Sequence, residues 1–164
     1  MLDQSNRPRP DRVQLKEVVC PAESIEIRNS LFIGGGISDC PDWQREMIEL
    51  LSDLPITAFN PRRPDFPMGD PAASLQQIDW EHRHLKLAEA ILFWFPKETL
   101  CPITLYELGK WTVSNKKLFI GVHPDYQRKI DVEIQTRLER PEVTVVNSLH
   151  DLAAQVQEWR LSKP

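Results

Sequence analysis

Short apolar runs alternate with amphipathic segments along this chain, and the alternation is its clearest structural signal. Runs that are apolar at nearly every position are typical of strands buried on both faces of a parallel sheet, and they occupy 30–34, 56–59, 90–95 and 118–122. Apolar residues at helical spacing predict helices over 42–53, 74–88, 102–114, 130–138 and 148–159. Weaker strand patterns lie at 13–20 and 143–146. The apolar positions of the second helix, which are expected to face the core, are Leu75, Ile78, Leu85 and Ala88.

Strands and helices that alternate at least four times predict an α/β fold: a doubly wound, flavodoxin/Rossmann-like parallel sheet with helices on both faces, in a single domain. The domain is expected to span 17–164, after a flexible, proline-containing arm over 1–16. Asp42 and Ser148 are placed to cap two of the helices. In such sheets ligands bind beyond the carboxyl ends of the strands, which here are 34–36, 60–63, 96–101 and 121–123.

Composition argues against several classes of function. The 164 residues carry a net charge of −4 with scattered Lys and Arg, which argues against a partner that is DNA or RNA. No apolar run approaches the roughly 20 residues that cross a membrane, and the first residues lack a signal-peptide pattern. Three separated cysteines without a CxxC pair indicate a reducing, cytoplasmic setting and no structural zinc. His82 and His84 diverge on their helix and are not expected to share a metal.

Glu107 is the most informative residue. It lies on the helix over 102–114 between Ile103 and Trp111, each four residues away, and little of that helix is polar. A helix that is apolar nearly all round is expected to be buried, so its carboxylate is paired, at a site, or at the rim of the core. Apolar surroundings raise the pKa of a carboxyl group, as catalytic carboxyl groups require. The competing interpretation is a surface pair with Lys110.

Glycines follow the first buried run. Gly34, Gly35 and Gly36 let a backbone approach a ligand closely and offer it N–H groups, although a plain tight turn explains them equally well. They do not form a GxGxxG fingerprint, so neither a dinucleotide nor any other cofactor is expected.

Polar residues follow or precede the other runs. Asn60, Arg62 and Arg63 are suited to hold a ribose hydroxyl and a phosphate or carboxylate, or else they form a solvated loop. Glu89 closes a helix beside the run over 90–95. It either reaches the same cleft or is an exposed residue at a helix end.

Six short segments occur in a specific order and spacing within about residues 30–122. They are Phe32-Ile-Gly-Gly-Gly36, Asp42-Trp-Gln44, Phe59-Asn-Pro-Arg-Arg63, Gln77-Ile-Asp-Trp-Glu81, Ile91-Leu-Phe-Trp-Phe-Pro96 and Pro102-Ile-Thr-Leu-Tyr-Glu-Leu-Gly109. Together they resemble the nucleoside 2-deoxyribosyltransferase-like family. The resemblance implies a doubly wound α/β fold, a small-molecule nucleoside or nucleotide as partner, and an enzyme that cleaves the N-glycosidic bond.

The resemblance also implies roles for single residues. The nucleophile of the family is the Glu of a Glu-Leu-Gly motif, which here is Glu107. Glu89, with Glu81 behind it, is the expected partner of the departing base. The remaining expected substrate contacts are Gly34, Gly35, Gly36 and Asn60 for the sugar and Trp43 or Trp94 for stacking on the base.

The sequence departs from characterised transferases at two places and leaves several activities open. Glu89 stands where an Asp is common, and Cys101 lies near the position of an Asp that precedes the nucleophile helix. A glycosyl-enzyme passes its sugar to a second base or to water, so transferase and N-hydrolase are alternatives. Two further alternatives are open. One is a nucleoside monophosphate hydrolase that binds the phosphate with Arg62 or Arg63, and the other is a non-catalytic sensor of a nucleotide derivative. Family members form oligomers in which a neighbour completes the site, so a homo-oligomer is implied.

Overall fold

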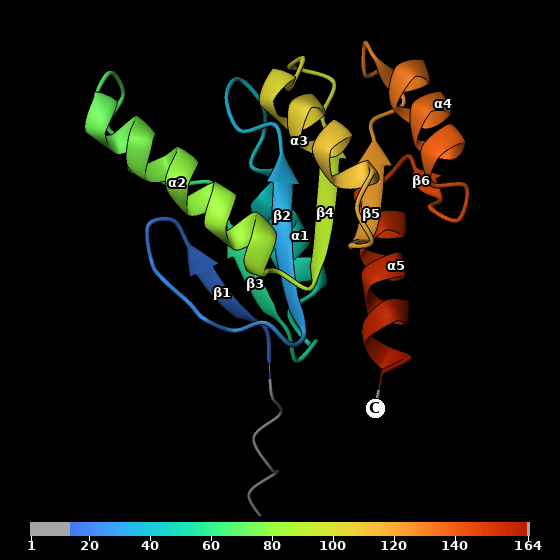
Figure 1. The fold of residues 1–164 in the computed structure, drawn as a ribbon, viewed down its shortest axis with the longest axis horizontal. Helices are drawn as coiled ribbons and strands as arrows, with labels where there is room; N and C mark the ends of the chain where they lie inside the picture. Colours follow the sequence, from blue (N-terminus) through green and yellow to red (C-terminus); the bar gives the residue numbers. More distant parts are fainter. Residues whose placement is uncertain (1–13, 164) are drawn as a thin grey trace, which may run out of the picture.

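A six-stranded sheet, parallel throughout, forms the centre of the computed structural model, which describes residues 14–163 (Figure 1). Its strand order is β1-β3-β2-β4-β5-β6. The strands are β1 (Lys16–Val19), β2 (Ser30–Gly35), β3 (Thr57–Asn60), β4 (Ala90–Phe95), β5 (Lys117–Val122) and β6 (Val145–Val146). The predicted arm over 1–16 lies mostly outside the described residues, and its last residue already belongs to β1.

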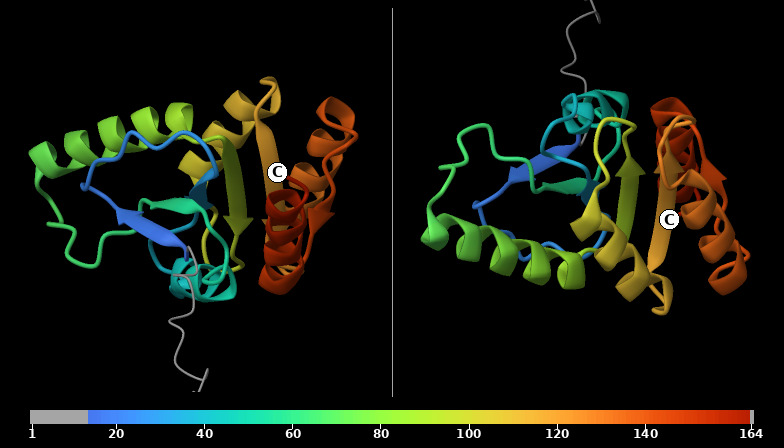
Figure 2. Two further views of the ribbon diagram at one scale, coloured as in Figure 1. Left: turned by 90° about the horizontal axis from the view of Figure 1, so that it is seen from below. Right: turned by 90° about the horizontal axis from the view of Figure 1, so that it is seen from above.

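Helices cover both faces of this sheet within residues 14–163. They are α1 (Trp43–Leu50), α2 (Pro71–Leu87), α3 (Pro102–Thr112), α4 (Lys129–Glu139) and α5 (Leu149–Leu161). Helices α2, α3 and α4 pack on one face, and α1 and α5 pack on the other (Figure 2). The predicted doubly wound α/β fold is therefore confirmed. No helix in the described range combines the length and the apolar character needed to cross a membrane.

Strand β4 shows how the sequence produces these two layers. All its residues are buried, and successive side chains of a strand point to opposite faces. Ile91, Phe93 and Phe95 join the core under α2, α3 and α4, whereas Leu92 and Trp94 join the core under α1 and α5. A strand with a core on each side needs an apolar residue at every position, which explains the unbroken run in the sequence.

The connections place a topological switch point beside β2. The chain passes from β2 to β3 on one side of β2, and then to β4 on its other side. In sheets of this kind, the loops that leave the two neighbouring strands part in opposite directions and leave a crevice at the carboxyl edge. This is the edge at which the sequence predicts a ligand.

The two predicted helix caps are confirmed, whereas the start of α2 differs from the prediction. Asp42 and Ser148 cap α1 and α5, because each side chain accepts a hydrogen bond from a backbone N–H in the first turn. Helix α2 begins at Pro71, after an Asp70 cap, rather than at residue 74. A proline at the first helical position costs no hydrogen bond, so the helix can begin at Pro71, three residues before the apolar pattern indicates.

The buried side of α2 also differs from the prediction. Leu75 and Ile78 are 69% and 64% exposed, so their predicted place in the core is wrong. Leu85 and Ala88 are buried as predicted, and the other buried residues of the helix are Ala73, Trp80 and His84. The rings of Trp80 and His84 stack with centroids 4.0 Å apart, which lets a histidine occupy an apolar position.

Candidate functional site

A pocket of about 350 Å³ opens at the carboxyl edge of the sheet, between α2 and α3. Its walls come from the end of β2 and the loop after it, from the residue after β3, and from the start of α3. The lining residues are Phe32, Gly34, Gly35, Gly36, Ile37, Ser38, Pro61, Glu81, Thr99, Cys101, Pro102, Ile103, Thr104 and Glu107. The volume lies within the range of about 300–1,000 Å³ that is typical of small-molecule sites.

Glu107 lines this pocket from the second turn of α3, and its side chain is partly buried. Burial raises its pKa to about 8, the nearby carboxyl of Glu81 adds to the rise, and Lys110 opposes it. The predicted alternative, a surface ion pair with Lys110, does not form within residues 14–163. The Lys110 ammonium lies instead 5.3 Å from the ring centroid of Trp111. The surroundings of Glu107 therefore disfavour its charged form.

Helix α3 starts at a sharp change of chain direction. Cys101 precedes the helix with a φ of 51°, in the left-handed region, and Pro102 occupies the first turn. The expectation that α3 is buried nearly all round is wrong, because Ile103 and Tyr106 are 65% and 74% exposed. Glu107 lies between the buried and the exposed face, which gives it both an apolar setting and access to the pocket.

Glu81 lines the same pocket from α2. Burial raises its pKa, and a hydrogen bond of 2.7 Å from Gln77 Nε2 to Glu81 Oε1 opposes the rise. The same amide nitrogen donates to the carbonyl of Pro61 at 2.7 Å. Two carboxyl groups whose charged forms are disfavoured therefore share one pocket, and acid–base and nucleophilic chemistry both use this arrangement.

Main-chain atoms form the pocket wall at the end of β2. Gly34, Gly35 and Gly36 line it. A Cβ on Gly35 would lie 2.4 Å from the ring of Trp43, and a Cβ on Gly36 would lie 2.8 Å from Sγ of Cys101. Larger residues do not fit at Gly35 or Gly36, so packing requires glycine at both positions.

A family model described as nucleoside 2-deoxyribosyltransferase like matches residues 28–126 of the 164. The chain belongs to this family. No curated protein matches the chain significantly. The matched segment contains every residue that lines the pocket, so the pocket lies within the part of the chain that defines the family.

Glu89 does not lie where the family resemblance placed it. It directly precedes β4 and is therefore at the amino end of that strand, whereas the pocket lies beyond the carboxyl ends. The six residues of β4 separate the two positions by roughly 20 Å. The Glu89 carboxylate accepts a hydrogen bond of 2.7 Å from the Asn29 N–H and pairs with Lys163. Its predicted place in the cleft is wrong, and Glu81 is the second acid of the pocket.

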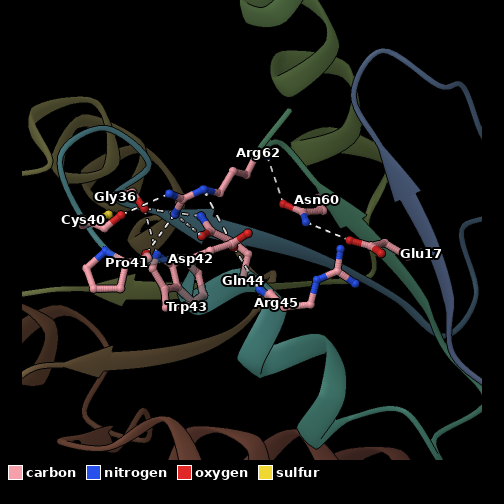
Figure 3. Close-up of polar contacts among 10 residues, drawn as sticks. All are labelled: Glu17, Gly36, Cys40, Pro41, Asp42, Trp43, Gln44, Arg45, Asn60 and Arg62. Carbon is pink, nitrogen blue, oxygen red and sulfur yellow. Dashed lines mark hydrogen bonds and ion pairs between the residues drawn. The ribbon is translucent and has the colours of Figure 1, made fainter. Parts of the chain in front are cut away.

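Asn60, the predicted sugar ligand, is engaged by the protein itself (Figure 3). Its Nδ2 donates to Oε1 of Glu17 at 2.8 Å, and its Oδ1 accepts from the backbone N–H of Arg62 at 3.0 Å. Asn60 thus joins β3 to β1 and does not line the pocket. The prediction that it holds a sugar hydroxyl has no support in this geometry.

The two arginines after β3 also bind protein groups. Arg62 donates to the carbonyls of Cys40 and Pro41 at 3.0 and 2.9 Å and to Oε1 of Gln44 at 3.1 Å, which fixes the loop before α1 (Figure 3). Arg63 donates to Oε1 of Gln76, on α2, at 3.1 Å. Neither guanidinium lines the pocket, so their predicted contact with a bound anion has no support here.

The tryptophans predicted to stack on a base are part of the core. Trp43 and Trp94 are 3% and 5% exposed and lie in the core under α1 and α5. Trp43 Nε1 donates to the carbonyl of Gly36 at 2.8 Å and so supports the pocket wall from behind. Neither ring lines the pocket, so the prediction that one of them stacks on a base has no support in this geometry.

Sequence reasoning missed part of the pocket lining before and within α3, and the side-chain amide of Gln77 that bonds Glu81. Thr99, Cys101 and Thr104 line it, but the sequence marked only Cys101, as a departure from the family. Burial raises the pKa of the Cys101 thiol to about 12, so it is a neutral group. Gln77 appeared only as the first residue of a family segment. Within residues 14–163, no three His, Cys, Asp or Glu side chains gather closely enough to hold a metal.

Proposed function

We propose that this protein cleaves the N-glycosidic bond of a nucleoside or 2-deoxynucleoside, with Glu107 as the nucleophile that carries the sugar. The observation behind the proposal is the pair of carboxyl groups, Glu107 and Glu81, that line one pocket from α3 and α2. Membership of the family supports the class of reaction and of substrate.

In the first half-reaction, a carboxylate oxygen of Glu107 bonds to the anomeric carbon while the bond from that carbon to the base nitrogen breaks. The electron pair of the broken bond stays on the base, which leaves poorly as an anion and therefore takes up a proton. Glu81 supplies this proton in place of Glu89. Because burial disfavours the charged form of both carboxyl groups, the pair retains a proton, and the reactive form is the one in which Glu81 carries this proton and Glu107 is ionised.

In the second half-reaction, a base nitrogen or a water molecule attacks the anomeric carbon and releases Glu107. Glu81, now ionised, accepts the proton of the incoming group. The backbone wall of Gly34, Gly35 and Gly36 offers polar groups to the sugar without crowding it. Transfer and hydrolysis differ only in the acceptor, so one assay distinguishes them.

The pocket favours an uncharged nucleoside over a monophosphate. Its lining residues include two carboxyl groups and no Lys, Arg or His. A phosphate would enter beside these carboxyl groups without a cation to meet it, since Arg62 bonds the loop before α1. The raised pKa of Glu107 also supports an enzyme over a sensor, because a protein that only binds its ligand gains nothing from a carboxyl group whose charged form is disfavoured by burial. The homo-oligomer and the cytoplasmic setting stay predictions.

The test is to incubate the purified protein with 2-deoxynucleosides, with and without a second free base, and to separate the products by chromatography. We expect an exchanged nucleoside, or free base and sugar if water is the acceptor. Parallel reactions with the corresponding monophosphates should be slower. Intact-mass measurement after acid quenching should detect a sugar attached to the protein.

Three glutamine variants assign the roles. Glu107→Gln should abolish turnover, and Glu81→Gln should lower kcat by about 10²–10⁴-fold, the usual contribution of a general acid or base. Glu89→Gln makes the same chemical change at the opposite edge of the sheet and is the matched control. Undiminished activity in Glu107→Gln would remove Glu107 from the reaction. Tight nucleoside binding by the wild type with no product under any condition would favour the sensor.

A further inference from the structure

Gln77 holds one of the two pocket carboxyl groups. Its Nε2 donates to Oε1 of Glu81 and to the carbonyl of Pro61, both at 2.7 Å. The Pro61 carbonyl is an acceptor in every protonation state, so the amide must turn its NH₂ group toward it, and the orientation of the amide is fixed. Because Pro61 follows β3, the contact fixes Glu81 relative to the edge of the sheet as well as to its own helix.

This contact makes the two oxygens of Glu81 unequal. Oε1 accepts from the amide whether the carboxyl group is ionised or not, since the carbonyl oxygen of a carboxylic acid is also an acceptor. A proton on Glu81 is therefore carried by Oε2. Within residues 14–163, Oε2 has no hydrogen-bond partner and is not among the buried unpartnered atoms, so it is accessible where Glu81 lines the pocket.

The titratable groups around Glu81 do not replace this contact. Glu107 faces it from α3, and Cys20 approaches it from the end of β1 with a thiol whose pKa burial raises to about 11. Gln77 also keeps its own Oε1 buried with no partner in the described part of the chain. An unpartnered buried acceptor lowers stability, so an apolar residue of similar size would pack here at less cost.

We propose that Gln77 is a positioning residue for proton transfer: it holds Oε1 of Glu81 so that Oε2 delivers the proton to the departing base. The inference rests on the proposed function. In this step the bond from the anomeric carbon to the base nitrogen breaks with its electrons moving to the base. The Oε2–H bond breaks with its proton going to the base, and the Glu107 oxygen bonds to the anomeric carbon. The base leaves neutral, and Glu81 is left as a carboxylate that still accepts from Gln77.

The experiment compares two substrates of Gln77→Leu, a variant that removes both donated bonds with little change in size. One substrate is an ordinary purine 2-deoxynucleoside, whose base must gain a proton as it leaves. The other is its N7-methylated analogue, whose cationic base leaves as a neutral molecule without one. We expect kcat/KM to fall about 10–100-fold on the first and less than about threefold on the second. Gln76→Leu, the same change at an exposed position of α2, should keep the wild-type ratio between the substrates.

An equal loss on both substrates would overturn the inference, because it would mean that Gln77 only holds α2 in place. The ratio is taken within each variant, so a smaller fraction of folded protein does not affect it. Gln77→Met provides a second apolar variant if Gln77→Leu does not fold. Wild-type protein that acts on neither substrate would refute the proposed function and this inference together. Wild-type protein that acts on both, with an unchanged ratio in Gln77→Leu, would refute the role of Gln77 alone.

Discussion

Glu107→Gln should make the folded protein more stable, and the gain should grow as the pH rises from about 4.5 to about 8. Between these two values the folded protein keeps on Glu107 a proton that the unfolded chain releases. The wild type therefore loses stability with each pH unit in this window, by about 1.4 kcal/mol at most. Glutamine has no ionisable proton, so the variant does not share this loss.

The size of the gain follows from the width of that window. About 3.5 pH units at about 1.4 kcal/mol each give an upper bound of about 5 kcal/mol above pH 8. The side chain of Glu107 is only partly buried, so water retains part of its solvation of the carboxylate. We therefore expect a measured gain of about 2–3 kcal/mol at pH 8, and little or none near pH 4.5.

The assay is urea unfolding of both proteins at whole pH units from 5 to about 9, with the free energies compared at matched m-values. Glu49→Gln, on the exposed side of α1, reports the general effect of removing one negative charge. Parallel curves of unfolding free energy against pH for the wild type and Glu107→Gln would refute the reasoning. They would show that the pocket does not disfavour the charged form of Glu107.

Two further substitutions and one control test the geometry outside the carboxyl pair. Glu89→Gln should leave the kcat of glycosidic cleavage within about twofold of the wild-type value. Its melting temperature should fall, because the pair with Lys163 is lost. A tenfold loss of kcat would return Glu89 to the mechanism. Gly35→Ala should destabilise the protein by about 3 kcal/mol or more, because its Cβ would lie 2.4 Å from the ring of Trp43. Gly109→Ala, where a Cβ meets nothing within 4 Å, should instead be neutral or stabilising in a helix, and equal melting temperatures for the two alanine variants would contradict the packing argument.

The strands and the binding edge could be predicted from the sequence because burial on both faces leaves an unambiguous pattern. The run over 90–95 became β4 with the predicted bounds, and the carboxyl edge predicted for ligands holds the pocket. Helix faces were harder to predict. On α2, His84 is buried against Trp80 while Leu75 is exposed, and hydropathy assigns both to the wrong side. Only the tertiary contacts of each residue decide whether its side chain is buried or exposed.

The residues of the site could be predicted only in part. Glu107 is a charged residue on a mostly apolar helix, and that contrast is visible in sequence. The misplacement of Glu89 was avoidable, because a residue that precedes a parallel strand lies at its amino end, away from bound ligands. Asn60 and Arg62 do lie at the correct edge, but sequence does not tell whether a polar side chain there bonds the protein or a ligand. Here both bond the protein.

The backbone wall of Gly34, Gly35 and Gly36 limits how the substrate specificity of this protein can change. Amide and carbonyl groups are the same in every amino acid, so point substitutions cannot adjust the chemistry of that side of the pocket, and Gly35 and Gly36 leave no space for a larger residue. Any adaptation to a different base or sugar therefore has to come from the side chains that line the rest of the pocket. A library meant to alter the substrate should vary Ile103 and Thr104, and should keep the glycines unchanged.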